Sequence, residues 1–148
     1  MRDEVSNANQ AIIDIRSIKS TLNDNKDEHK SKASFENYND ISEQLIEKLE
    51  VIENNIHMTK NQSYQDPLNY GIRINNRLAF LMQDQQRGDY PPTQQAEEFR
   101  ISVTEELNEE LSTLNSLISR TLPRLNQIGK SIGIEELVSD RVIRPNRP

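Results

Sequence analysis

Apolar residues recur every three or four positions along most of this chain, a spacing that predicts amphipathic α-helices. The first apolar stripe begins at Val5 and ends at Leu22, and the longest extends from Ala96 to Ile128. Two further stripes lie between them. The pattern therefore predicts four helices, over about residues 3–24, 37–60, 67–87 and 93–132.

The segments between the stripes carry residues that favour turns or solvent. Residues 23–32 are charged and polar without apolar periodicity, which predicts a mobile connector. The segment through Tyr64 is predicted to be a short loop. Gly88 is suited to the left-handed conformation that follows a helix end, and Tyr90-Pro91-Pro92 predicts an extended turn.

Helix starts are marked by capping residues. Asn37 or Asp40 is a candidate cap for the second helix. Asp66 followed by Pro67 predicts a sharp start for the third, because an aspartate accepts hydrogen bonds from free amides and proline suits the first helical position. Thr93 is the predicted N-cap of the fourth helix. Glu97 and Glu98 lie in its first turns, where the positive end of the helix dipole stabilises negative charge.

The last stripe contains a proline. Pro123 removes a backbone donor inside the helix, so we predict a kink near residues 119–123 without a full break. Beyond Gly133 the apolar pattern weakens. Residues 134–148 are therefore predicted to form a C-terminal tail, with one added turn over 135–138 and an extended end over 144–148.

These helices predict one domain over residues 1–133. Four amphipathic helices with short connections favour an all-α, up-down-up-down four-helix bundle in which each apolar stripe faces the others. The alternative is an extended coiled coil, which requires uninterrupted heptads. Gly88, the Pro91-Pro92 pair and Pro123 interrupt the repeat, so the bundle with a long, kinked last helix is the predicted fold.

Composition narrows the function classes. The 148 residues carry a net charge of −6, with acidic and basic residues mixed along the sequence, which argues against a nucleic-acid surface. The chain has no cysteine, so thiol catalysis and thiolate metal sites are excluded. It shows neither an apolar run long enough to span a bilayer nor a secretory signal after Met1.

The third predicted helix carries an unusual number of side-chain donors. One interpretation is that these side chains bind loop carbonyls and the acids of the second or fourth helix, and so fix the bundle. The other is a docking surface, because arginine and tyrosine are common energetic anchors of interfaces. The candidate structural or docking residues are Asp66, Pro67, Asn69, Tyr70, Arg73, Asn76 and Arg77.

Candidate catalytic groups are few. Glu105 and Glu106, and likewise Glu109 and Glu110, form carboxylate pairs, but glycoside hydrolysis needs two carboxyl groups on separate elements flanking a cleft. A solvated acidic face is the preferred interpretation, and a hydrolase remains a remote alternative. A di-iron bundle needs Glu-x-x-His on two helices, a spacing that neither His57 in the second helix nor His29 in the connector meets. No catalytic residue, metal or cofactor is expected.

The run from Thr59 to Ala79, with its core Asp66-Pro67-Leu68-Asn69-Tyr70-Gly71-Ile72-Arg73, resembles the helical C-terminal region of secreted bacterial BNR-repeat, sortilin-like β-propeller proteins. Val5-Ser6-Asn7-Ala8-Asn9 and Pro92-Thr93-Gln94-Gln95 are similar to two other helix starts of that family. Gly71 stands where a proline is expected. The resemblance implies an extracytoplasmic parent protein, periplasmic or secreted, in which a propeller precedes this chain, and a Met1 introduced within the first helix.

Members of that family are often labelled glycosyl hydrolases, but such chemistry would belong to propeller residues that this sequence does not contain. The resemblance therefore implies a non-catalytic accessory or interaction module, whose partner is the upstream β-propeller of the same polypeptide or another protein. The alternative is a self-associating module that forms a homodimer.

Overall fold

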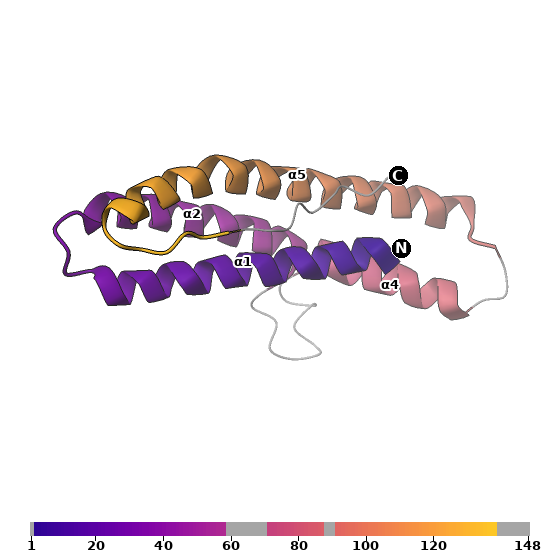
Figure 1. Ribbon diagram of the computed structural model, residues 1–148. Helices are drawn as coiled ribbons and strands as arrows, with labels where there is room; N and C mark the ends of the chain where they lie inside the picture. Colours follow the sequence, from indigo (N-terminus) through magenta and orange to yellow (C-terminus); the bar gives the residue numbers. More distant parts are fainter. Residues whose placement is uncertain (1, 59–70, 88–90, 139–148) are drawn as a thin grey trace.

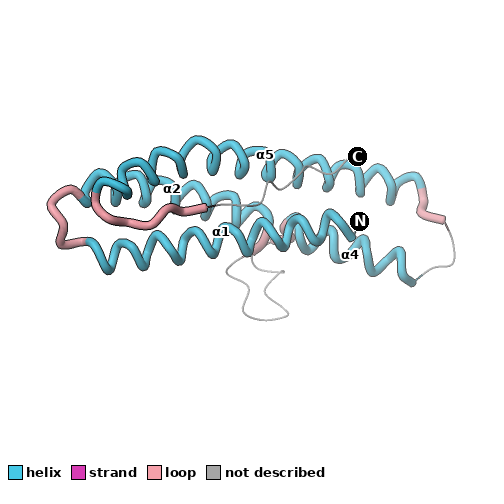
Figure 2. Tube along the Cα trace, in the orientation of Figure 1, coloured by secondary structure: helices cyan, strands magenta, loops and turns pink. Residues whose placement is uncertain are grey.

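The computed structural model describes residues 2–58, 71–87 and 91–138. These residues form four helices, and no strand occurs among them: α1 (Arg2–His29), α2 (Phe35–Ile56), α4 (Ile74–Arg87) and α5 (Gln94–Ser131). Figures 1 and 2 show them packed side by side as an elongated bundle. The predicted all-α four-helix bundle is confirmed.

The longest helix, α5, organises the bundle. Its 38 residues span about 57 Å at 1.5 Å per residue. Near the end of α2, Asn55 donates a hydrogen bond to Glu110 of α5, while Arg77 of α4 bonds Glu106, one turn away on α5. The shorter helices α2 and α4 therefore follow one another along α5 in the same direction (Figure 1), so strict up-down alternation does not extend to this pair.

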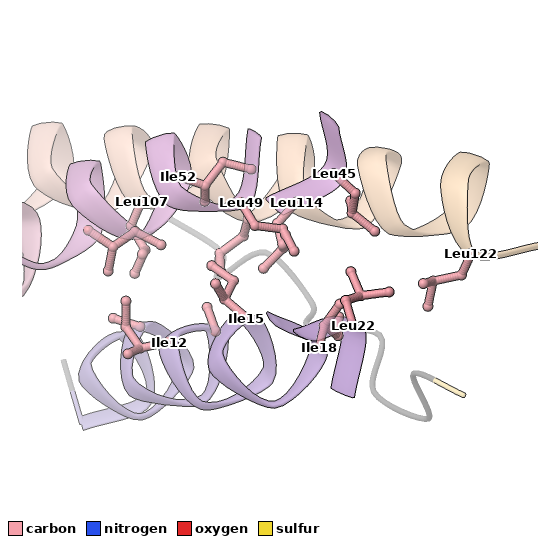
Figure 3. Close-up of a cluster of buried hydrophobic side chains, with 14 of the residues drawn as sticks. Ile12, Ile15, Ile18, Leu22, Leu45, Leu49, Ile52, Leu107, Leu114 and Leu122 are labelled. Carbon is pink, nitrogen blue, oxygen red and sulfur yellow. The ribbon is translucent and has the colours of Figure 1, made fainter. Parts of the chain in front are cut away.

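The core is a narrow apolar seam. Side chains of α1 point toward those of α2 and α5, as Figure 3 shows around Ile15, Leu49 and Leu114. Burying a large aliphatic side chain stabilises the fold by about 1.5–3 kcal/mol, so the bundle depends on this seam. Its members exposed by 1% or less are Ala8, Ala11, Ile15, Leu22, Tyr38, Leu45, Leu49, Ile56, Leu78, Val103, Leu107, Leu111, Leu114 and Leu125.

The predicted mobile connector over residues 23–32 is wrong for most of its length, because α1 continues to His29. Two contacts with α2 hold this last part of α1 in place. Asn25 donates to the Tyr38 hydroxyl at 3.1 Å, and Lys26 pairs with Glu43 at 2.8 Å. Tertiary contacts thus stabilise a segment that has no apolar stripe of its own.

The second helix also differs at both ends. It begins at Phe35 after the N-cap residue Ser34, whose side chain makes no capping hydrogen bond, and it ends at Ile56, short of the predicted residue 60. The predicted caps Asn37 and Asp40 lie inside the helix. Burial of Phe35, whose ring packs on that of Tyr38 with centroids 5.7 Å apart, explains the earlier start.

The third predicted helix begins later than expected. Its helical part, α4, starts at Ile74, and residues 71–73 have no regular structure. Gly71 has a φ of 81°, a left-handed conformation that glycine adopts without strain. The predicted start at Asp66 and Pro67, together with Asn69, Tyr70, Gly88 and Tyr90, lies outside the described residues.

The start of α5 agrees with the sequence. The Thr93 hydroxyl accepts a hydrogen bond from the Ala96 amide at 3.2 Å, which confirms Thr93 as N-cap. The helix continues unbroken through Pro123, as predicted, and this proline lies on the exposed side. The kink itself stays a prediction.

At its C-terminus α5 is closed by a glycine motif. Gly133 has a φ of 80°, its amide bonds the Lys130 carbonyl, and the Ile134 amide bonds the Gly129 carbonyl at 2.9 Å. This pair of bonds is the Schellman arrangement. Lys32 of the α1–α2 loop donates to the Ile132 carbonyl at 2.7 Å. Residues 134–138 then follow without regular structure, so the added turn predicted over 135–138 is wrong.

Candidate functional site

The polar face of α4 meets α5 through an ion pair. Arg77 bonds both oxygens of the Glu106 carboxylate, with Nη1 to Oε1 at 2.9 Å and Nη2 to Oε2 as the second bond. The bond from Arg77 holds the pKa of Glu106 below its usual value, although partial burial opposes this. A planar guanidinium matches a carboxylate in two places, so the pair fixes the orientation of α4 on α5.

The other described candidates lie close to this pair. Asn75 donates a hydrogen bond to Asn9 of α1 at 3.2 Å, and this bond connects the opposite side of α4 to α1. Arg73 precedes the helix and is half-buried, as is Asn76. For Arg77, the expectation of a bond to an acid of the last helix is confirmed. The structure thus brings Arg73, Asn76 and Arg77 to one end of α4.

Two exposed aromatic residues lie on the same side of the ion pair, toward the start of α5. Phe80, 67% exposed, stands one helical turn after Arg77 and Asn76 on α4, and therefore shares their face. Phe99, 42% exposed, lies seven residues, or two turns, before Glu106 on α5. We call these residues the aromatic–arginine face: Arg73, Asn76, Arg77 and Phe80 of α4 with Phe99 and Glu106 of α5.

Sequence reasoning missed Phe80 as a site residue. The buried residues of α4 are Ile74, Leu78 and Leu81, and Phe80 falls outside the stripe that they form. The sequence signal that could have indicated it is a large aromatic residue on the polar face of an amphipathic helix. Phe99 lies within the apolar stripe predicted from Ala96 to Ile128, and it is instead partly exposed.

Elsewhere, buried acids hold the helices together. Glu53 of α2 is 3% exposed and accepts bonds from Arg16 at 2.7 Å and Lys19 at 3.1 Å, both of α1. Burial acts to raise the pKa of Glu53, but the bonds and charges of these two cations outweigh it, so its pKa is lowered. Near the start of α1, Arg100 of α5 reaches Glu4 at 3.4 Å, and it also pairs with Glu97 of its own helix at 2.6 Å.

The four carboxylates weighed as catalytic groups do not converge. Glu105 and Glu109 are exposed, Glu106 faces α4, and Glu110 faces α2 through its bond from Asn55 at 2.9 Å. Burial, with a smaller contribution from Glu109, raises the pKa of Glu110. The carboxylate of Glu106 is instead paired with the guanidinium of Arg77. This geometry does not place two carboxyl groups across a shared space.

The two histidines lie at the ends of α1 and α2. His29 lies in the last turn of α1, where the connector was predicted, and its Nε2 is 3.8 Å from Glu28. His57 follows the end of α2 as its C-cap and is partly exposed. Within the described ranges, no group of three or more histidine and carboxylate side chains is placed to hold a metal ion.

Comparison with protein-family models, with curated protein sequences and with solved structures finds no match for this chain. The resemblance to the helical region of BNR-repeat, sortilin-like proteins therefore stays a prediction. Among the helices of the described segments, none combines the length and the apolar character needed to cross a membrane.

Proposed function

We propose that this chain is a non-catalytic helical interaction module that binds a protein partner through the aromatic–arginine face. The observation that carries the proposal is the exposure of Phe80, 67%, one turn from an arginine already held in place by Glu106. An exposed ring beside an ordered arginine is the composition of an interface hot spot, where aromatic and arginine side chains supply most of the binding energy.

The proposed partner is the β-propeller that the resemblance places upstream in the same polypeptide, in an extracytoplasmic setting. Arg77 supports a docking role because its position is fixed before binding, so little side-chain entropy is lost when a partner contacts its exposed surface. The diverging carboxylates of α5 give no support to the hydrolase alternative.

The test compares this chain alone with a polypeptide in which the proposed propeller precedes it, by hydrogen exchange followed by mass spectrometry. We expect peptides covering residues 74–84 and 95–106 to gain protection in the longer protein. In that protein, Phe80→Ala together with Phe99→Ala should remove the added protection, while the control Val51→Ala, at a 60% exposed apolar residue of α2, should leave it unchanged.

A second copy of the chain is the competing occupant of the same face. Size-exclusion chromatography with light scattering over a range of concentrations distinguishes the two. A monomer whose α4–α5 peptides are protected only in the longer polypeptide supports the proposal. A dimer that Phe80→Ala dissociates replaces it with self-association, and unchanged exchange in both proteins refutes it.

A further inference from the structure

A second surface of the molecule concentrates positive charge. Between α2 and α5 lies a hollow of about 460 Å³ lined by Lys48, Arg120 and short hydroxyl side chains of α5. A smaller hollow of about 180 Å³ adjoins it, shares Lys48 and Arg120, and adds Arg124. Together they form one groove, which we call the basic groove. It extends from Ser112 to Arg124, or about 18 Å along α5.

Among the described residues, the cations of the basic groove have no acidic partners. No ion pair joins Lys48, Arg120 or Arg124 to any described residue. None of the described residues that line the groove is acidic. Elsewhere on the bundle Arg16, Lys19, Lys26, Arg77 and Arg100 all contact carboxylates. The chain carries six more acidic than basic residues, so this grouping of unpaired cations is opposite to its overall charge.

The arrangement costs stability in the absence of a ligand. Arg120 and Arg124 are four residues apart on α5, and like charges at this spacing repel each other by a few tenths of a kcal/mol. An anion placed between them and Lys48 would remove this repulsion. The cations of the groove therefore repel each other less when an anion is bound than when none is bound.

Hydroxyl groups add hydrogen-bonding capacity beside the charges. Arg120 donates to the Ser116 hydroxyl at 2.6 Å, which leaves the proton of that hydroxyl available to a ligand. Ser112 and Thr121 line the groove, and their hydroxyl groups form no hydrogen bond within the described part of the chain. Thr113 instead donates to the Glu109 carbonyl at 2.9 Å. Because serine and threonine are short, they leave the hollow open between the longer cationic side chains.

We propose that the basic groove binds a small ligand carrying a phosphate or sulfate group. A tetrahedral oxyanion accepts several hydrogen bonds at once, which matches two guanidinium groups, one ammonium group and the adjacent hydroxyls. An anionic membrane is the less suitable source of such a group, because the groove is a narrow concave strip on a protein whose net charge is −6.

The test is a titration of the protein with sodium pyrophosphate at constant ionic strength, followed by NMR. We expect saturable shifts of the Ser116 and Thr121 amides with a dissociation constant of about 1 mM or tighter. A parallel titration with sodium sulfate compares the two oxyanions. Arg120→Gln with Arg124→Gln should weaken binding about tenfold or more, because exposed charge pairs contribute up to about 1 kcal/mol each.

The matched control is Lys30→Gln with Lys130→Gln, which removes the same charge outside the groove and should leave the affinity within about twofold. Circular dichroism confirms that both double variants remain helical. Absence of shifts in the wild type, shifts located elsewhere, or equal weakening in the control would overturn the proposal. So would binding to vesicles of anionic phospholipid with no binding of pyrophosphate or sulfate.

Discussion

The side chain of Asn126 on α5 holds the backbone of Leu137 by two hydrogen bonds. Its amide nitrogen donates to the Leu137 carbonyl at 2.9 Å, and its oxygen accepts from the Leu137 amide at 2.8 Å. The amide side chain thus satisfies both backbone groups of a residue that lies outside any helix. This contact keeps the segment after Gly133 against the bundle, where Ile134 is buried.

Asn126→Ala should release that segment. The variant loses two hydrogen bonds, each with a net value of about 0.5–1.5 kcal/mol, so we expect the free energy of unfolding to fall by about 1–3 kcal/mol. Urea denaturation measures the loss, and the Leu137 amide should exchange faster with solvent. Gln127→Ala, at the exposed neighbour, is the control and should change stability by less than about 0.5 kcal/mol.

Glu53 should make the bundle sensitive to acid. Its folded-state pKa lies below the ordinary value of 4.5, so its stabilising effect is complete above that pH and is lost as pH falls through the lower folded-state value. Glu53→Gln should therefore cost about 1–3 kcal/mol at pH 7 and reduce the fall in stability below about pH 4.5. Urea denaturation at several pH values measures both effects.

The control for Glu53 is Glu47→Gln, at an exposed glutamate of the same helix. It should leave the pH profile of stability close to that of the wild type. If Glu53→Gln and wild type lost stability in parallel between pH 5 and about pH 3, the proposed role of the pairs with Arg16 and Lys19 would be wrong.

Gly129 is a packing position. A Cβ added there would lie 3.2 Å from Cε2 of Tyr38 and 3.3 Å from Cβ of Ile134, closer than ordinary contact. Alanine gains about 1 kcal/mol of helix propensity, but overpacking a tight site costs about 1–3 kcal/mol. We therefore expect Gly129→Ala to lower the thermal unfolding midpoint, whereas Lys130→Ala should not. An unchanged or raised midpoint would show that Tyr38 and Ile134 can move apart at low cost.

Thr104 offers a stabilising substitution. Its hydroxyl is fully buried on α5 and has no hydrogen-bond partner among the described residues. Valine has the same shape without the polar atom, so Thr104→Val should raise the free energy of unfolding by about 1 kcal/mol. Thr113→Val, at an exposed residue of the same helix, is the matched comparison. Destabilisation by Thr104→Val in urea denaturation would indicate that the hydroxyl is satisfied in solution.

Apolar periodicity was sufficient to predict four helices but not all of their ends, because each long stripe faces a single seam. The end of α1 was missed for a physical reason. Asn25 and Lys26 are stabilised there by Tyr38 and Glu43, and contacts with a partner helix leave no periodic signal in the local sequence. Local propensity is overridden in such segments by tertiary contacts.

The candidate site was predictable only in part. The density of donors around Arg73 and Arg77 indicated a bonded polar face, and Arg77 does bond Glu106. The exposure of Phe80 and the grouping of Lys48 with Arg120 depend on how the helices are rotated and aligned. Residues from α2 and α5 that line one groove are far apart in the sequence, so no local pattern indicates them.

The succession of α2 and α4 along α5 gives the bundle two parts with different helix partners. One contains α2 with the C-terminal half of α5, the other α4 with its N-terminal half, and α1 and α5 run through both. Because α2 and α4 contact each other little, we expect the shorter α4 part to open locally at a lower free energy than the α2 part. We therefore expect the end of the bundle that carries the proposed interface to change shape more readily than the end that carries the basic groove.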